Sequence, residues 1–308
     1  MATIPWRRVQ TVRPRSPAAR WINLQGGDSM AQLGFHGLIG VGLARLVAPG
    51  ETQEGSVRAE SSPKGGVGSR DEKAPLADPA RNLRWGLVVG SILPDTDFFL
   101  LGPLYLIDAQ LGLAMHRTFT HSLLVAAAVL GYFRLRSGGG RDHALWSLGV
   151  GIAAGLAAHA LTDLIVWFSG VDLLWPLGLL GLPSWVNFWA GHVNPPIVPK
   201  LLGAADYLAF ALFYLYVRNR AQALGTDLDF VPRVNRYLQL SVLLWVLYTG
   251  LALTSISASL FDIAHYAVFI VAFLPMILQT TWRMRTTLSA PWQAATPAAT
   301  AAPTAGRR

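Results

Sequence analysis

Several side chains that can bind a metal ion or hold charge occur inside or beside long apolar runs of this sequence. Histidine and aspartate supply imidazole and carboxylate ligands, and arginine supplies a fixed positive charge. An ionised carboxylate in hydrocarbon is costly, by several kcal/mol, so such groups need a cation or a proton beside them. The residues are His36, Asp95, Asp97, His116, Arg117, His121, His159 and Asp163.

The octapeptide MHRTFTHS holds the densest group of these residues. His116 and His121 are five positions apart, so on one continuous helix their side chains would point in different directions. A site that uses both therefore needs His116 just before a helix and His121 in its first turn, with Thr118 or Thr120 as the N-cap. We expect Arg117 to pair with an acid or to meet an anionic substrate. For either histidine alone, a hydrogen-bonded packing role is the default alternative.

The sequence SILPDTD interrupts another apolar run. Pro94 breaks the helix there, and Asp95 and Asp97 can then both turn toward one centre. The alternative is a polar turn at a helix end, with both acids solvated.

A further pair of candidate ligands lies in the fourth apolar segment. His159 and Asp163 are four residues apart and so share one face of a helix. Gly151 and Gly155 keep that helix slim enough for a neighbour to pack closely. An intrahelical hydrogen bond without metal is the alternative. His36, which precedes closely spaced glycines in the first apolar segment, carries little weight alone.

Together these residues predict a metal centre without sulfur ligands, because the chain has no cysteine. Zn is the expected ion, with Mn, Fe or Mg as alternatives, and the number of ligands is enough for two ions. Hydrolysis by an activated water is the natural chemistry of such a centre. The expected metal ligands are His36, Asp95, Asp97, His116, His121, His159 and Asp163.

The composition predicts that these residues are held by membrane helices. The 308 residues are 52% hydrophobic and only 14% charged, with a mean hydropathy of +0.39, whereas a soluble chain has about a quarter of its residues charged. We expect an all-α, polytopic transmembrane bundle with six or seven membrane-spanning helices. The apolar segments are 33–48, 85–107, 111–133, 145–168, 201–217, 238–256 and 263–282.

Arginines that follow the third, fifth and seventh segments orient this bundle, because cytoplasmic loops are enriched in Lys and Arg. The C-terminus is then cytoplasmic and the candidate ligands lie toward the outer face. Seven crossings would put the N-terminus outside, which conflicts with the arginines before residue 21. Either translation starts at Met30 or the first segment does not cross.

Four regions are expected along the chain. Residues 1–29 form a disordered basic arm or precede the true start, and residues 30–190 form the metal-dependent membrane domain, with a flexible loop at 50–84. Residues 191–285 contain the C-terminal transmembrane helices, and residues 286–308 a disordered tail. An apolar stretch after the fourth segment, broken by prolines and glycines, is a lid or an interfacial aromatic belt.

The ordered combination of these motifs resembles the YdjM family of inner-membrane proteins, described as metal-dependent hydrolases and as LexA-binding. The motifs are His36 with its glycines, PDTD at 94–97, HRTFTHS at 116–122, and His159 with Asp163. The resemblance covers about residues 30–190. It implies a bacterial inner-membrane protein with a His/Asp metal centre. LexA binding is not carried over, because none of these residues provides a surface for it.

The leading hypothesis is therefore a membrane-embedded metal-dependent hydrolase that acts on a lipid or lipid-linked ester or phosphoester. His36 would act as a ligand or as a base, and Arg117 would steady a negative charge. Two alternatives remain, an ion or proton transporter and a regulatory protein with a structural metal site. Only one interrupted polar helix is expected, which favours the enzyme. Membrane lipid is the expected partner and nucleic acid is not, because basic clusters interleaved with aromatics are absent.

Overall fold

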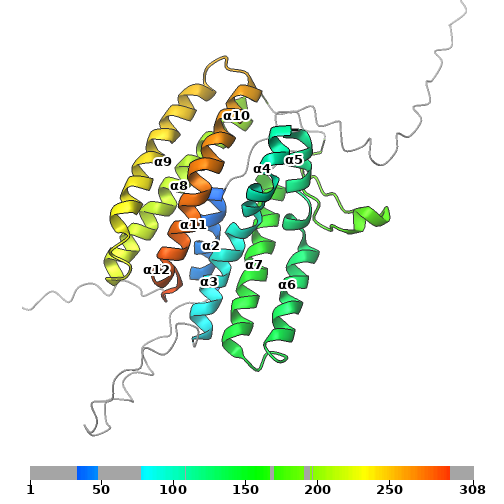
Figure 1. The fold of residues 1–308 in the computed structure, drawn as a ribbon, viewed down its shortest axis with the longest axis vertical. Coiled ribbons are helices and arrows are strands. Elements are labelled where there is room, and N and C mark those ends of the chain that lie inside the picture. The colour runs from blue at the N-terminus through cyan, green and yellow to red at the C-terminus, as the bar shows by residue number, and fades with distance from the viewer. Residues whose placement is uncertain are drawn as a thin grey trace, which may run out of the picture.

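The apolar segments form helices in a computed structural model of the protein (Figure 1). The structure describes residues 33–47, 78–107, 109–166, 170–190, 195 and 197–291. Within these ranges every regular element is helical, and the only β pairing is an isolated bridge between Val171 and Val186. The all-α prediction is confirmed. The proposed arm at 1–29, most of the loop at 50–84 and most of the tail at 286–308 lie outside the described residues. Where they are described, residues 79–84 and 286–289 are helical, so these parts of the expected loop and tail are wrong.

The helices that matter for the site come from the first half of the chain, and the second half supports them. Their bounds are α2 Leu33–Val47, α3 Pro79–Ile92, the 3-10 turn η2 Leu93–Asp97, α4 Phe98–Ile107, α5 Ala109–His116, the 3-10 turn η3 Phe119–His121, α6 Leu123–Arg136, α7 His143–Val166, the 3-10 turn η4 Leu177–Leu180, α8 Ile197–Leu224, α9 Val231–Ala252, α10 Ala258–Val268, the π-turn η5 Phe269–Phe273, α11 Leu274–Arg283 and α12 Arg285–Ser289.

Helices α3 and α7 pack closely through glycines on both helices. A methyl group on Gly86 would lie 2.5 Å from the carbonyl oxygen of Leu148, and one on Gly155 would lie 2.6 Å from that of Leu87. Since only glycine leaves room for this approach of two backbones, the predicted role of small residues in the fourth segment is confirmed. The contact holds His159 and Asp163 of α7 beside the end of α3.

Helix α2 lies between the two halves of the bundle (Figure 1), in contact with α3, α7 and α8. It is largely apolar, and three of its four glycines, Gly34, Gly37 and Gly40, face neighbouring helices. A methyl group on Gly34 would lie 2.6 Å from the backbone nitrogen of Phe210, and one on Gly37 would lie 3.2 Å from the ring of Phe213. The aromatic core of the second half, built around Tyr207 and Phe210, therefore reaches the helix that carries His36.

Among the described residues, four helical stretches are long and apolar enough to cross a membrane. They are Pro79–Leu104, His143–Val166, Ile197–Leu224 and Ala258–Arg283. The predicted count of six or seven is not confirmed. Helix α2, with 15 residues, is shorter than the roughly 20 that a crossing needs.

The third predicted segment, 111–133, is not one helix, and that prediction is wrong. Helix α5 ends at His116 and α6 begins at Leu123, with the short turn η3 between them. The polar residues at 116–122 bind one another and the neighbouring loop instead of continuing the helix. The chain therefore contains two interruptions, one at η2 and one between α5 and α6, where only the first was expected.

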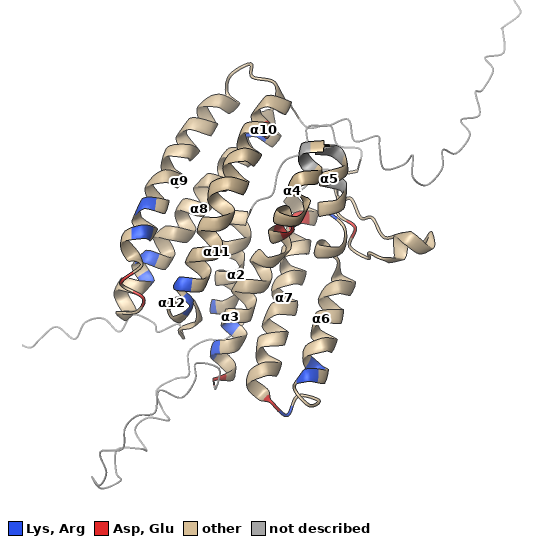
Figure 2. Cartoon of the chain, in the orientation of Figure 1, with Lys and Arg blue, Asp and Glu red and all other residues tan. Residues whose placement is uncertain are grey.

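Most of the described arginines gather at one end of the bundle, at the ends of helices (Figure 2). Arg45, Arg136 and Arg283 lie in the last turns of α2, α6 and α11, and Arg84 lies in the N-terminal half of α3. Helix α3 runs from this end of the bundle toward η2, which carries Asp95 and Asp97.

Candidate metal centre

Six of the seven predicted ligands meet in the interior of the bundle. They come from five elements, α2, η2, α5, η3 and α7, and form three overlapping groups in which the candidate ligand atoms lie within 4.8 Å of one another. The groups are His36, Asp95 and His159; Asp95, His116 and His121; and His121, His159 and Asp163. The structure thus brings these six side chains together, and their common depth in a membrane stays a prediction.

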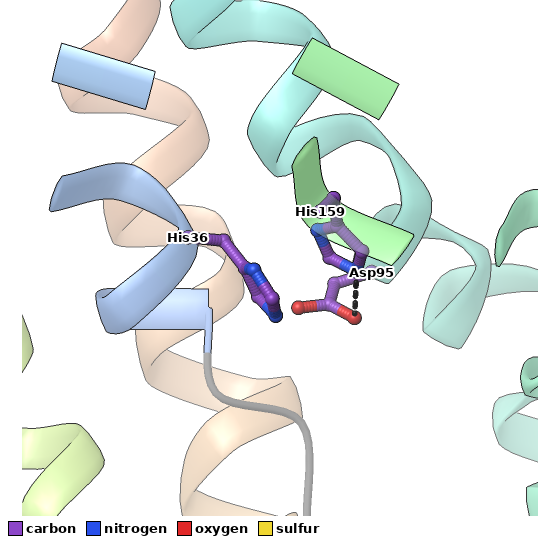
Figure 3. A group of neighbouring side chains, drawn as sticks. All are labelled: His36, Asp95 and His159. Carbon is purple, nitrogen blue, oxygen red and sulfur yellow. Dashed lines mark ion pairs between the residues drawn. The ribbon is translucent and has the colours of Figure 1, made fainter. Parts of the chain in front are cut away.

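The first group joins α2, η2 and α7 (Figure 3). His159 Nε2 lies 3.5 Å from Asp95 Oδ1, and the rings of His36 and His159 stack with their centroids 3.6 Å apart. His36 and Asp95 are 1% exposed and His159 is fully buried. Two stacked imidazoles facing a carboxylate without solvent are a suitable ligand set for a cation, because the carboxylate needs a positive partner.

The second half of α7 adds Asp163 to this arrangement. Asp163 Oδ2 lies 2.9 Å from His121 Nε2 and 3.6 Å from His159 Nε2, while the two imidazole Nε2 atoms are 3.1 Å apart. On the other side, Asp163 Oδ1 lies 2.9 Å from His36 Nε2. One carboxylate therefore stands between three imidazoles, as expected of a residue able to bridge ligand groups.

His116 connects the centre to Asp97. Its Nε2 lies 3.4 Å from Asp95 Oδ1, and its Nδ1 lies 2.6 Å from Asp97 Oδ1. Asp97 is absent from all three groups of the described residues. This geometry is that of a carboxylate that accepts a hydrogen bond from a ligating imidazole and orients it, as is common beside metal sites. Direct ligation by Asp97 stays a prediction.

Thr120 contacts two of the candidate site residues, which the sequence did not predict. Its hydroxyl lies 2.8 Å from Asp97 Oδ2 and 2.9 Å from His121 Nδ1. The hydroxyl can donate to the carboxylate and accept from the imidazole, which leaves His121 Nε2 free to act as a ligand. Its position directly before His121 was the available signal, but Thr120 was considered only as a helix cap.

The tautomer of His159 is set in the same way by the backbone. His159 Nδ1 lies 2.7 Å from the carbonyl oxygen of Ser91, near the end of α3. A ring nitrogen that donates to a carbonyl oxygen carries the proton, so Nε2 faces the centre with its lone pair. The break that Pro94 introduces after α3 places this carbonyl and Asp95 on the same side.

A family model described as YdjM inner membrane protein matches residues 30–255. The chain belongs to the YdjM inner membrane protein family. Searches of curated proteins and of solved structures found no match. The family match extends beyond the expected residues 30–190 and includes α8 and α9. Family membership and the apolar helices assign the protein to a membrane.

The donor set of this YdjM protein fits a divalent cation. Both oxygens of Asp95, Nδ1 of His36 and Nε2 of His116 are buried and make no hydrogen bond within the described residues, whereas Nε2 of His36 and Oδ1 of Asp163 lie 2.9 Å apart as an ion pair. Buried polar atoms without partners are rare in folded proteins, because each one costs about 1–3 kcal/mol. A cation shared by the carboxylates and imidazoles would satisfy these atoms together, whereas hydrogen bonding leaves them unsatisfied.

The local structure of the HRTFTHS motif in this YdjM protein differs from the prediction. His116 ends α5 and His121 ends η3, so His121 does not lie in the first turn of a helix. Ser122, not Thr118 or Thr120, caps α6 by accepting a hydrogen bond from the backbone nitrogen of Leu124. The cap shifts toward the C-terminus because the hydroxyl of Thr120 binds Asp97 and His121 instead.

Other polar residues are placed away from the groups. Arg117 is buried, and its carbonyl oxygen accepts a hydrogen bond from the backbone nitrogen of Asp172, so its predicted contact with an anion stays a prediction. His143 begins α7 and is exposed. His192 and Asn194 lie outside the described residues.

Proposed function

We propose that this protein is a membrane-embedded metal-dependent hydrolase that acts on a lipid or lipid-linked ester or phosphoester. The observation that carries the proposal is the convergence of four imidazoles and two carboxylates, all buried, in an apolar helical bundle. A divalent ion held by these residues would supply Lewis-acid chemistry and a water activated for attack. Zn fits a histidine-rich set without cysteine, and the three overlapping groups are compatible with two ions.

The depth of the centre supports a lipid-like substrate. Helix α7 has 24 residues and is therefore about 36 Å long, enough to cross the hydrocarbon core. Asp163 and His159 lie about one and two turns before its end at Val166, which corresponds to about 5 and 10 Å. The centre is thus close to the level where the ester and phosphoester groups of lipids lie.

The arginines support an orientation. Cytoplasmic ends of membrane proteins are enriched in arginine, and most of the described arginines lie at the end of the bundle away from η2 (Figure 2). We infer that this end is cytoplasmic, that the end of α11 with Arg283 lies on the same side, and that the centre faces the outer leaflet.

Within the site, the chain's own residues have separate roles in this proposal. His36 reaches the centre from α2, with its Nε2 2.9 Å from Asp163 Oδ1, and in this proposal it acts as a ligand or as a proton acceptor. Asp97 and Thr120 hold His116 and His121 in orientation. Arg117, buried next to His116, would stabilise negative charge on an ester or phosphoester substrate.

The test is metal content and turnover of the protein purified in detergent. Wild type should bind a divalent ion and hydrolyse at least one member of a panel of lipid esters and phosphoesters. His159→Ala should lose both metal and turnover, whereas His143→Ala, which changes an exposed histidine outside the centre, should keep both. Metal retained by wild type without turnover on any substrate would contradict the enzyme proposal.

The two interrupted helices favour one further candidate, an ion transporter. Discontinuous helices whose broken ends carry ligands are typical of secondary transporters, and η2 and η3 both contribute to the centre. Uptake of a divalent ion into proteoliposomes, abolished by Asp95→Asn and accompanied by no hydrolysis, would support this function instead.

A further inference from the structure

An apolar hairpin emerges from the bundle directly beside the metal centre. Residues 170–190, which we call the leucine hairpin, leave the end of α7, fold back through the bridge between Val171 and Val186, and project sideways (Figure 1). The turn η4 lies in this hairpin. The hairpin is the part of the described chain that extends furthest from the packed helices on this side.

The base of the hairpin is fixed to the segment that carries two candidate ligands. Asp172 donates its backbone N–H to the carbonyl oxygen of Arg117 at 3.0 Å, and Leu123 donates its own to the carbonyl oxygen of Leu173 at 2.9 Å. The hydroxyl of Ser122 donates to the carbonyl oxygen of Trp175 at 2.7 Å. The hairpin therefore has a defined position relative to His116 and His121.

The hairpin beyond its base is apolar and exposed. Leu179 and Leu180 are 75% and 74% exposed, and Leu182 is 52% exposed. No lysine, arginine, aspartate or glutamate occurs from residue 173 to residue 199. In water, such a surface would be costly, because each exposed leucine keeps apolar area hydrated.

The one carboxyl group at the base is also compatible with an apolar environment. Asp172 is 2% exposed and interacts with the Ser184 side chain. Burial raises the pKa of Asp172, although the hydrogen bond from Ser184 acts in the opposite direction. Backbone groups at the base are paired within the hairpin, between Val171 and Val186 and from Leu174 to Ser184, and with the segment at 117–123.

We propose that the leucine hairpin is a lipid-binding element, whose tip inserts among the acyl chains just below the headgroups of the leaflet nearest the metal centre. Acyl chains fit the uncharged tip, whereas an exposed protein interface would carry a polar rim. Tryptophan is enriched at the membrane interface, and the hairpin contains Trp175, Trp185 and Trp189. Because its base is fixed to the ligand-bearing segment, an inserted tip would hold the centre at headgroup depth.

This inference deepens the proposed function, because it rests on the same centre and explains how a lipid headgroup would come within its reach. The absence of cysteine makes a direct test simple. The Leu180→Cys variant would be reconstituted in proteoliposomes and labelled with a fluorophore. One measurement uses lipids that carry a quencher either high or low on the acyl chain, and a second uses iodide as a quencher in water. No enzymatic activity is measured, so this test can fail independently of hydrolysis.

Two further positions calibrate the measurement. Arg141→Cys, in the exposed turn between α6 and α7, reports quenching by iodide in water. Val271→Cys, 78% exposed in the middle of the apolar stretch Ala258–Arg283, reports quenching by acyl-chain quenchers. Each replacement is at an exposed side chain, so the fold should be retained.

The expected result is that the label at position 180 is quenched by the shallow lipid quencher at least as strongly as the label at position 271, and weakly by iodide. Strong quenching by iodide would place the tip in water and overturn the proposal. Weak quenching by both lipid and iodide would show that protein, such as a second copy of the chain, covers the tip, and this outcome would overturn it too.

Discussion

At the scale of single residues, Asp97 and Thr120 each hold one imidazole of the centre in orientation through a hydrogen bond. His116 and His121 each have one ring nitrogen engaged, by Asp97 Oδ1 and by the Thr120 hydroxyl respectively. The remaining nitrogens then point to the centre. Such hydrogen bonds orient the imidazole and raise its basicity, so they affect metal affinity without touching the ion.

Replacing Asp97 by Asn should weaken metal binding by about 10–100-fold, because the amide accepts the hydrogen bond from His116 less strongly than a carboxylate does. Affinity would be measured by competition with a chelating dye. Asp142→Asn is the matched control, since Asp142 only caps α7 by accepting from Leu145 and Asn caps helices equally well. Unchanged affinity in Asp97→Asn would contradict an orienting role for Asp97.

At the scale of elements, glycine determines how closely the ligand-bearing helices approach. Gly155→Ala should destabilise the protein by about 1–3 kcal/mol, because the added methyl group would lie 2.6 Å from the carbonyl oxygen of Leu87. Gly131→Ala in α6 is the control, because a methyl group there meets no atom within 4 Å, and this change should stabilise by up to about 1 kcal/mol. Thermal unfolding in detergent measures both. Equal midpoints would contradict the close packing of α3 and α7.

A second element-scale feature joins α8 to the centre through α2. Asp206 Oδ1 accepts hydrogen bonds from the backbone nitrogens of Gly34 and Phe35, at 2.9 and 3.4 Å. These N–H groups lie in the first turn of α2, where a helix offers no internal acceptor. A carboxylate from a helix 172 positions away in the sequence thus fixes the turn that carries His36.

Asp206→Ala should therefore lower metal affinity by about fivefold, equivalent to the roughly 1 kcal/mol of a lost helix cap. Asp206→Asn keeps an acceptor oxygen and should restore most of the affinity. In a His36→Ala background the Asp206→Ala change should have no further effect on metal affinity, since it acts through His36. An equal loss with and without His36 would contradict this positioning role.

At the scale of the whole molecule, the centre links elements that are distant in the sequence. Removing the cation should leave buried carboxylates and imidazoles unsatisfied, so a strong chelator should lower the thermal midpoint. The loss should be about 2.7 kcal/mol relative to metal at 100 times its dissociation constant. Readdition of Zn should restore the midpoint, and His159→Ala should respond to neither treatment. A wild-type midpoint insensitive to chelation would contradict a bound structural or catalytic ion.

The sequence by itself determined the class of the fold and most of the candidate ligands that meet in the interior. A low charge content with long apolar runs indicates membrane helices, and the cost of burying ionisable groups identified His36, Asp95 and the other members of the centre. The four-residue spacing of His159 and Asp163 was sufficient to predict that their side chains lie on the same face, because both belong to one helix.

Only the tertiary structure decided which partner each group has. The break at 117–122, the role of Thr120 and the separate position of Asp97 depend on contacts between η2, η3 and the leucine hairpin, which local periodicity does not encode. Likewise, in the sequence Asp206 is an isolated acid in an apolar segment. Its hydrogen bond to the start of α2 forms only because α8 packs against α2. Local patterns specify helices and burial, whereas hydrogen-bond partners depend on how the helices are brought together.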